Sequence, residues 1–139
     1  MATSVKMSNQ TSRSVILITT VLLGAAGIAL ISAPVEIAGA LGIPEPAGMA
    51  ILIQLYGAAL FGLGMTGWTV KDSVIGGVFG RSYVVGNAAH SFVGALVLIR
   101  PALAGATPAF WVLTVVYWLL AIAFGYLMFI AAPGAKKAS

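Results

Sequence analysis

The sequence predicts an all-α fold, an integral membrane bundle of four helices with both termini in the cytoplasm. Of its 139 residues, 60% are hydrophobic and 7% are charged, whereas soluble domains average about 25% charged residues. Four apolar stretches of roughly 18 to 24 residues occupy most of the chain, and each can cross a hydrocarbon core about 30 Å thick. The basic residues also gather on one side of a four-span topology, which fixes the predicted orientation.

The four predicted spans cover residues 15–33, 48–70, 82–99 and 109–132. Before the first span, residues 1–14 are expected to form a cytoplasmic tail, and residues 133–139 form another after the last. Residues 71–80 connect the second span to the third, either as a loop or as a helix at the membrane interface. Together these segments predict one transmembrane domain and no soluble domain.

Prolines mark the predicted helix ends. Pro34 ends or kinks the first helix because proline has no backbone donor. Pro44 and Pro46 predict a turn before the second span. Thr107 and Pro108 predict the start of the fourth helix, with a hydroxyl at the cap and proline at the first helical position.

Charge predicts the orientation and the surroundings of the chain. Arg100 is the only basic residue on the predicted outer side, which also contains Glu36 and Glu45. The other basic residues lie on the inner side: Lys6, Arg13, Lys71, Arg81, Lys136 and Lys137. By the positive-inside rule both termini are cytoplasmic. The net charge of +4 is then explained by topology and by anionic headgroups. We therefore expect membrane lipids, and no nucleic acid, as partners, and a bacterial cytoplasmic (inner) membrane as the location.

The sequence contains no pattern that predicts an enzyme. There is no cysteine and a single histidine, so a thiolate nucleophile and a sulfur-ligated metal site are excluded. Serine–histidine–aspartate sets, H-E-x-x-H, a P-loop and paired carboxylates at helical spacing are also missing. We predict no catalytic residue, no metal and no required cofactor.

The single histidine, His90, belongs to a polar stripe in the third predicted span. Tyr83, Asn87, His90, Ser91 and Gly94 recur at spacings of three and four, so they share one face of a helix. His90 falls near the membrane midplane if Arg81 and Arg100 extend to opposite interfaces. With one residue from each neighbouring span, the predicted polar cluster consists of His90, Asn87, Gln54, Tyr83 and Tyr117.

Small residues in the spans predict close helix contacts, because glycine and alanine let helices approach each other in lipid. Examples are the rows Ala50–Gln54–Ala58–Gly62 and Tyr117–Ala121–Gly125. The positions that we assign to helix packing are Gly57, Gly62, Gly86, Gly94, Ala121 and Gly125.

Four interpretations of His90 follow from these patterns. In the first, it is a packing residue that hydrogen-bonds to Asn87, Gln54 or Tyr117. In the second, Gly86 and Ala89 leave room beside it for a tetrapyrrole. In the third, the polar cluster binds a quinone, a lipid or a sterol. In the fourth, it carries protons in a small transporter, although no broken helix or inverted repeat supports transport.

Two segments, LGIPEPAGMAILIQLYGAALFGLGMTGWTVKDS and RSYVVGNAAHSFVGAL, resemble a widespread group of small bacterial four-span proteins of unknown function. The resemblance rests on Gly57, Gly62, Gly64, Asn87 and His90, while Gln54 stands where many members have an arginine. In outline the chain is also similar to the DoxX-like group and to the ergosterol-biosynthesis scaffold proteins. These resemblances imply a non-catalytic accessory protein.

The sequence therefore predicts an accessory or scaffolding subunit that packs against other membrane proteins or against copies of itself. The alternative from another class is a protein that binds a hydrophobic small molecule at the cluster around His90.

Overall fold

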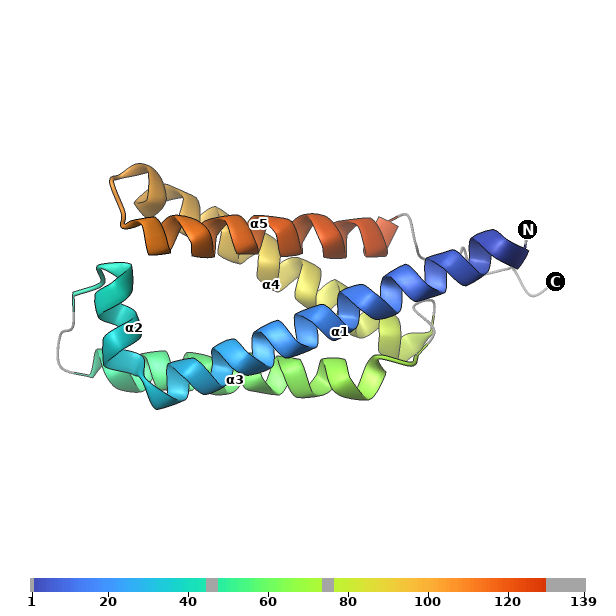
Figure 1. The fold of residues 1–139 in the computed structure, drawn as a ribbon, viewed down its shortest axis with the longest axis horizontal. Helices are drawn as coiled ribbons and strands as arrows, with labels where there is room; N and C mark the ends of the chain where they lie inside the picture. Colours follow the sequence, from blue (N-terminus) through green and yellow to red (C-terminus); the bar gives the residue numbers. More distant parts are fainter. Residues whose placement is uncertain (1, 45–47, 74–76, 130–139) are drawn as a thin grey trace.

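The computed structural model describes residues 2–44, 48–73 and 77–129, and these form five helices and no strand (Figure 1). The helices are α1 (Ala2–Ser32), α2 (Pro34–Leu41), α3 (Met49–Val70), α4 (Val78–Leu103) and α5 (Pro108–Phe129). This arrangement confirms the all-helical prediction. Four of the helices are long and apolar enough to cross a membrane: Gln10–Ser32 of α1, and the whole of α3, α4 and α5.

Two helices are longer than the sequence predicts. α1 starts at Ala2, so the described part of the expected tail continues the first helix. α4 starts at Val78 instead of Ser82, and the Ser82 hydroxyl donates to the Val78 carbonyl 2.8 Å away within its first turns. Residues 78–80 of the predicted connection are thus helical. The turn at Pro46, residues 130–132 and the tail at 133–139 lie outside the described residues.

The short helix α2 is absent from the sequence prediction. Ala33 leaves the helical region with φ −137° and ψ 56°, and Pro34 begins α2 at its first turn. Gly42 ends α2 in the left-handed conformation, at φ 70°, and its N–H bonds back to the Ala38 and Gly39 carbonyls. Pro34 therefore ends the first helix and starts another. Its proline start, early acid at Glu36 and terminal glycine are ordinary helix signals in the sequence.

The long helices form two antiparallel pairs, in which α1 packs along α3 and α4 packs along α5 (Figure 1). Glycine explains the closeness of the first pair. A Cβ atom added to Gly27 would lie 2.6 Å from the Gly57 carbonyl oxygen and 2.6 Å from the Phe61 nitrogen. A Cβ atom on Gly64 would lie 2.9 Å from the nitrogen of Gly24. The two backbones are therefore in direct contact.

The two pairs meet at one end of the molecule, which we call the closed end. Its core joins Ile16 of α1 with residues of α4 and α5: Tyr83, Val84, Phe124 and Leu127. The rings of Tyr83 and Phe124 pack edge to face, with centroids 6.0 Å apart. From this core the pairs diverge toward the opposite end, the open end, where α2 and the α4–α5 connection lie (Figure 1).

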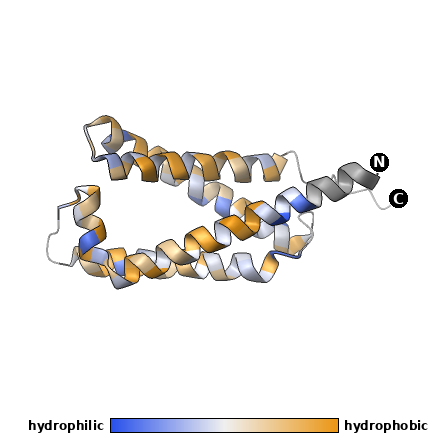
Figure 2. Cartoon of the chain, in the orientation of Figure 1, coloured by the Kyte–Doolittle hydropathy of each residue, from blue (hydrophilic) through white to orange (hydrophobic). Residues whose placement is uncertain are grey.

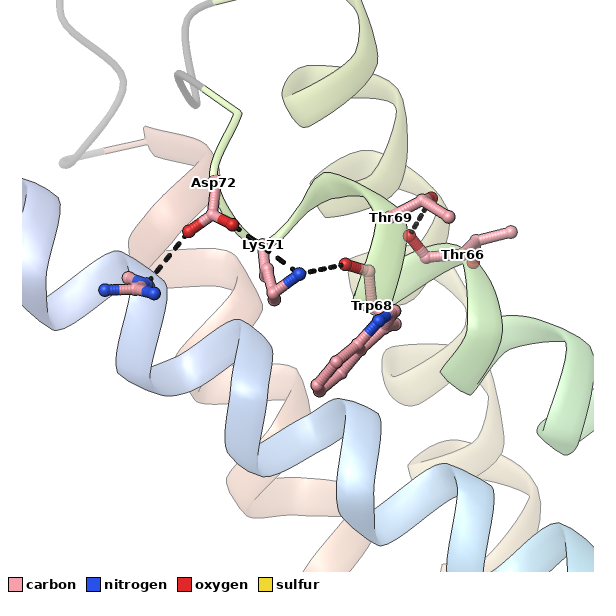
Figure 3. Close-up of polar contacts among 6 residues, drawn as sticks. Thr66, Trp68, Thr69, Lys71 and Asp72 are labelled. Atoms are coloured by element: carbon pink, nitrogen blue, oxygen red, sulfur yellow. Dashed lines mark hydrogen bonds and ion pairs between the residues drawn. The ribbon is translucent and has the colours of Figure 1, made fainter.

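Charged residues gather at the surface of the closed end (Figure 3). Arg13 Nε lies 3.1 Å from Asp72 Oδ1, and Lys71 Nζ lies 3.5 Å from Asp72 Oδ2. Lys71 also donates to the Trp68 carbonyl over 3.2 Å and sits 4.3 Å from the centre of the Trp68 ring. These contacts tie α1 to the α3–α4 connection. The Asp72 carboxylate is exposed in both contacts, so they hold α1 in position beside the α3–α4 connection but add little to the stability of the fold.

Thr107 joins α2 to the start of α5 at the open end. Its hydroxyl donates to the Ala40 carbonyl over 3.1 Å and accepts the Phe110 N–H over 3.4 Å. The second bond confirms the predicted helix start at Thr107 and Pro108. A Cβ atom on Gly42 would lie 2.9 Å from the Thr107 methyl group, so this glycine lets α2 approach.

Replacing Thr107 with valine should lower the free energy of unfolding by about 1 to 2 kcal/mol, because a helix cap and one inter-helix hydrogen bond are lost. Thr107→Ser keeps the hydroxyl and should stay close to the parent protein. Unfolding by sodium dodecyl sulfate, followed by circular dichroism, measures both. If Thr107→Val were as stable as the parent while Thr107→Ser were destabilised, the methyl contact and not the hydroxyl would hold α2.

Hydrophobic residues are spread along all the long helices (Figure 2). No more than 28% of any candidate span is buried inside the chain. Large apolar side chains such as Ile18, Val97 and Ile122 are about two-thirds exposed, at 67%, 65% and 65%. In water so much apolar area would drive association. These surfaces suit contact with lipid chains or with other membrane helices.

Candidate functional site

A large apolar cleft lies between the two helix pairs. Its volume is about 1550 Å³, and all five helices contribute to its lining. α2 lines it at the open end with Ile37, Ala38 and Leu41. Among the lining residues that the structure describes, only Tyr56, His90 and Tyr117 carry polar side-chain atoms. The cleft is therefore a hydrophobic space with a single polar position.

These three residues, which we call the Tyr–Tyr–His cluster, come from three different helices. The hydroxyls of Tyr56 on α3 and Tyr117 on α5 are hydrogen-bonded to each other. Tyr117 Oη also lies 3.3 Å from Nε2 of His90 on α4. The His90 ring centre is 6.3 Å from that of Tyr56 and 5.6 Å from that of Tyr117. The cluster thus connects the two helix pairs across the cleft.

Gly94 positions Tyr117 within this cluster. It lies one turn after His90 on α4, and a Cβ atom there would collide with the Cδ1 and Cε1 atoms of the Tyr117 ring. The Tyr117 ring therefore packs directly against the α4 backbone at Gly94, and the residue is only 7% exposed. Because this contact holds the ring, its hydroxyl is directed toward His90.

The cluster retains one hydrogen-bond donor for a ligand. With the proton on Nδ1 of His90, Nε2 accepts from Tyr117, Tyr117 accepts from Tyr56, and the Nδ1–H remains free. With the proton on Nε2, His90 donates to Tyr117 and Tyr117 donates to Tyr56, so the Tyr56 hydroxyl keeps a free hydrogen. In either tautomer of the neutral cluster one donor is left over, at one end of the row or the other.

Of the five residues predicted from the sequence, the structure brings His90 and Tyr117 together in the cleft and places Asn87 beside Tyr83, while Gln54 lies apart from both pairs. Gln54 donates through Nε2 to the Ile31 carbonyl, 3.1 Å away on α1. The reason is Gly57, which brings α1 so close to α3 that this carbonyl lies within reach of the amide. Gln54 thus serves the α1–α3 contact, and it does not line the cleft.

Tyr83 and Asn87 lie deeper in the closed end than His90. Asn87 is 1% exposed, and its Nδ2 donates to the Tyr83 carbonyl over 3.0 Å. The Tyr83 hydroxyl is buried against Gly67, facing Thr20 of α1, and neither hydroxyl has a partner of normal hydrogen-bond geometry in the described part of the chain. The polar stripe of α4 crosses from the packed core into the cleft, so its residues have different surroundings.

The sequence analysis missed Tyr56, the third member of the cluster. Gln54 was preferred as the polar residue of this span, but Tyr56 lies two positions later and faces another side of α3. The signal in the sequence that points to Tyr56 is its depth along the helix. Tyr56 and Tyr117 both lie about two turns from the open-end starts of their helices, which brings their hydroxyls to one level.

The predicted packing positions divide into two groups. Gly57 and Gly94 lie at close contacts with α1 and with Tyr117. Gly62, Gly86 and Gly125 have no atom within 4 Å of an added Cβ, so each has open space beside it in this chain. Ala121 is half-buried on α5. Contacts at the second group would need lipid or another molecule.

Four long apolar helices that expose most of their surface define a multi-pass membrane protein. Neither a protein-family model, nor a curated protein, nor a solved structure matches this chain. Within the described residues, no three histidine, cysteine, aspartate or glutamate side chains lie close enough together to hold a metal ion.

Proposed function

We propose that the protein binds a hydrophobic small molecule in the cleft between its helix pairs, with the Tyr–Tyr–His cluster bonded to the ligand's polar group. The supporting observation is the cleft itself, about 1550 Å³ in volume and apolar except at Tyr56, His90 and Tyr117. Small-molecule sites are typically apolar spaces of about 300–1,000 Å³ with a few convergent polar groups. This cleft has that character, and it has room for a molecule the size of a membrane lipid.

In this proposal the chain is a four-helix membrane bundle of the bacterial inner membrane with both termini in the cytoplasm. Arg13, Lys71 and Arg81 belong to the closed end, and Arg100 belongs to the other end of α4. That distribution supports a cytoplasmic closed end. Trp68 and Trp111, near opposite ends of the bundle, suit the two membrane interfaces.

Single cysteines can test this orientation, because the chain has none of its own. Ala104→Cys at the open end should react with a membrane-impermeant maleimide added to intact bacterial spheroplasts. Val78→Cys at the closed end should react only after the membrane is permeabilised. The reverse pattern would place the termini outside and contradict the proposed topology.

His90→Leu should abolish retention of the small molecule, since it removes one end of the cluster's hydrogen-bonded row. The measurement is native mass spectrometry of protein extracted gently from its own membrane. Gln54→Leu is the matched control, because it removes a polar side chain that does not line the cleft. A parent protein without a bound small molecule, or a His90→Leu variant that keeps it, would contradict the proposed function.

A second candidate is an accessory or scaffolding subunit of a larger membrane assembly or a homo-oligomer. One observation favours it: Ala58, Gly62 and Thr66 form an exposed row of small residues on α3, with open space beside Gly62. Such rows are where helices contact each other in lipid. Co-purifying protein subunits without a small-molecule mass, in the same experiment, would favour this candidate.

A further inference from the structure

We infer that the ligand of this cleft is an uncharged amphiphile, bound with a carbonyl or hydroxyl group at the Tyr–Tyr–His cluster and with its apolar part against the apolar lining. The inference rests on the proposed function of the cleft and specifies what kind of molecule the cleft selects. Three features support it: where the cluster lies along the cleft, the charge of the lining, and the unused donor.

The cluster lies partway along the cleft. On α1 the lining extends beyond the cluster toward the closed end, through Leu23 to Leu17, since Gly24 already packs at the level of Gly64. On α4 the lining begins with His90 and continues only toward the open end, through Val93, Gly94, Val97 and Leu98. On α3 and α5, one lining residue each, Leu60 and Leu120, lies beyond the tyrosines toward the closed end, and all the others lie toward the open end. On α5 that apolar stretch, from Tyr117 back to Ala109, is about 12 Å long at 1.5 Å per residue.

The ligand's polar group should therefore sit at the level of the cluster, inside the cleft, with its apolar part against the apolar lining. A bilayer lipid is arranged differently, because its headgroup stays at the surface. An acyl chain in the cleft would place only methylene groups at the cluster. The cluster's remaining donor would then be left without a partner in apolar surroundings, which is unfavourable for a polar group.

Charge restricts the ligand further. Among the described residues, no lysine, arginine, aspartate or glutamate lines the cleft. The ion pairs among the described residues lie at the closed-end surface, on Arg13, Lys71 and Asp72. A charged group at the depth of the cluster would have no counter-ion of fixed charge, and placing a charge at the centre of a membrane helix costs about 2.5 to 3.5 kcal/mol on the insertion scale. A neutral carbonyl or hydroxyl oxygen accepts the remaining donor without this cost.

Three photoreactive probes would test the inference on the full-length protein in phosphatidylcholine nanodiscs. Each probe has the same dodecyl chain with a diazirine at its far end, and the head is a methyl ketone, a carboxylate or a trimethylammonium group. Peptide mass spectrometry locates the crosslinks. The ketone probe should label residues that line the cleft about tenfold more than either charged probe does. His90→Leu should reduce that labelling to the level of the charged probes, while Gln54→Leu should not.

The other outcomes separate this inference from the proposed function. Equal labelling of the cleft by all three probes would overturn the neutral-ligand inference and leave the binding function intact. No labelling of any lining residue would overturn the proposed function together with this inference.

Discussion

Replacing Gly27 with leucine is expected to separate α1 from α3 and to lower the free energy of unfolding by about 3 kcal/mol, the upper end of the usual overpacking cost. The first added carbon would lie 2.6 Å from two backbone atoms of α3, the Gly57 oxygen and the Phe61 nitrogen. Backbone atoms inside a helix cannot move aside as a flexible side chain does. The helices must therefore move apart, and the Gln54–Ile31 hydrogen bond should break with them.

The matched control is Gly62→Leu on α3, where an added carbon meets no atom within 4 Å. Titration with sodium dodecyl sulfate, monitored by circular dichroism of the monomer, compares the two variants with the parent. We expect a lower midpoint for Gly27→Leu and an unchanged one for Gly62→Leu. Equal midpoints for the two variants would mean that α1 and α3 are not in backbone contact. A change of oligomeric state in Gly62→Leu alone would favour the subunit interpretation.

Filling the cleft should remove ligand binding without unfolding the protein. Val93 on α4 and Ala29 on α1 both line the cleft, on opposite helix pairs. Tryptophan at both positions would occupy space that the ligand needs, and we expect the affinity for the ketone probe to fall at least about tenfold, which is 1.4 kcal/mol. Because the Val93 and Ala29 side chains are exposed within the chain, tryptophan fits at both positions without forcing helices apart.

The control for this double variant is Leu96→Trp with Ile28→Trp, on the same two helices. Both side chains are exposed, at 47% and 55%, and neither lines the cleft. This control should bind the probe as the parent does, and both double variants should keep the parent's circular dichroism. A cleft-filled variant that still retains the probe would place the binding site elsewhere on the protein.

The site could be predicted from the sequence only in part. Periodicity identified the stripe on α4, and it named His90 and Tyr117, which do meet. It could not choose between Gln54 and Tyr56, because the rotation of α3 about its axis depends on which face the glycines bring against α1. Since Gly27 and Gly57 make that contact, Gln54 faces α1 and Tyr56 faces the cleft. The rotation of α3 about its axis is thus decided by its packing against α1, and the periodicity of α3 alone does not determine it.

Hydropathy and length alone predicted four apolar helices, since crossing a hydrocarbon core requires about 20 apolar residues with their backbone bonds satisfied inside each segment. These are local requirements. The pairing of α1 with α3 and of α4 with α5, the divergence of the pairs from the core at Ile16 and Phe124, and the resulting cleft are decided only by the tertiary structure. Lipid chains are as apolar as the side chains, so hydropathy does not distinguish a surface that faces lipid from one that faces a cleft; close contact at individual glycines does.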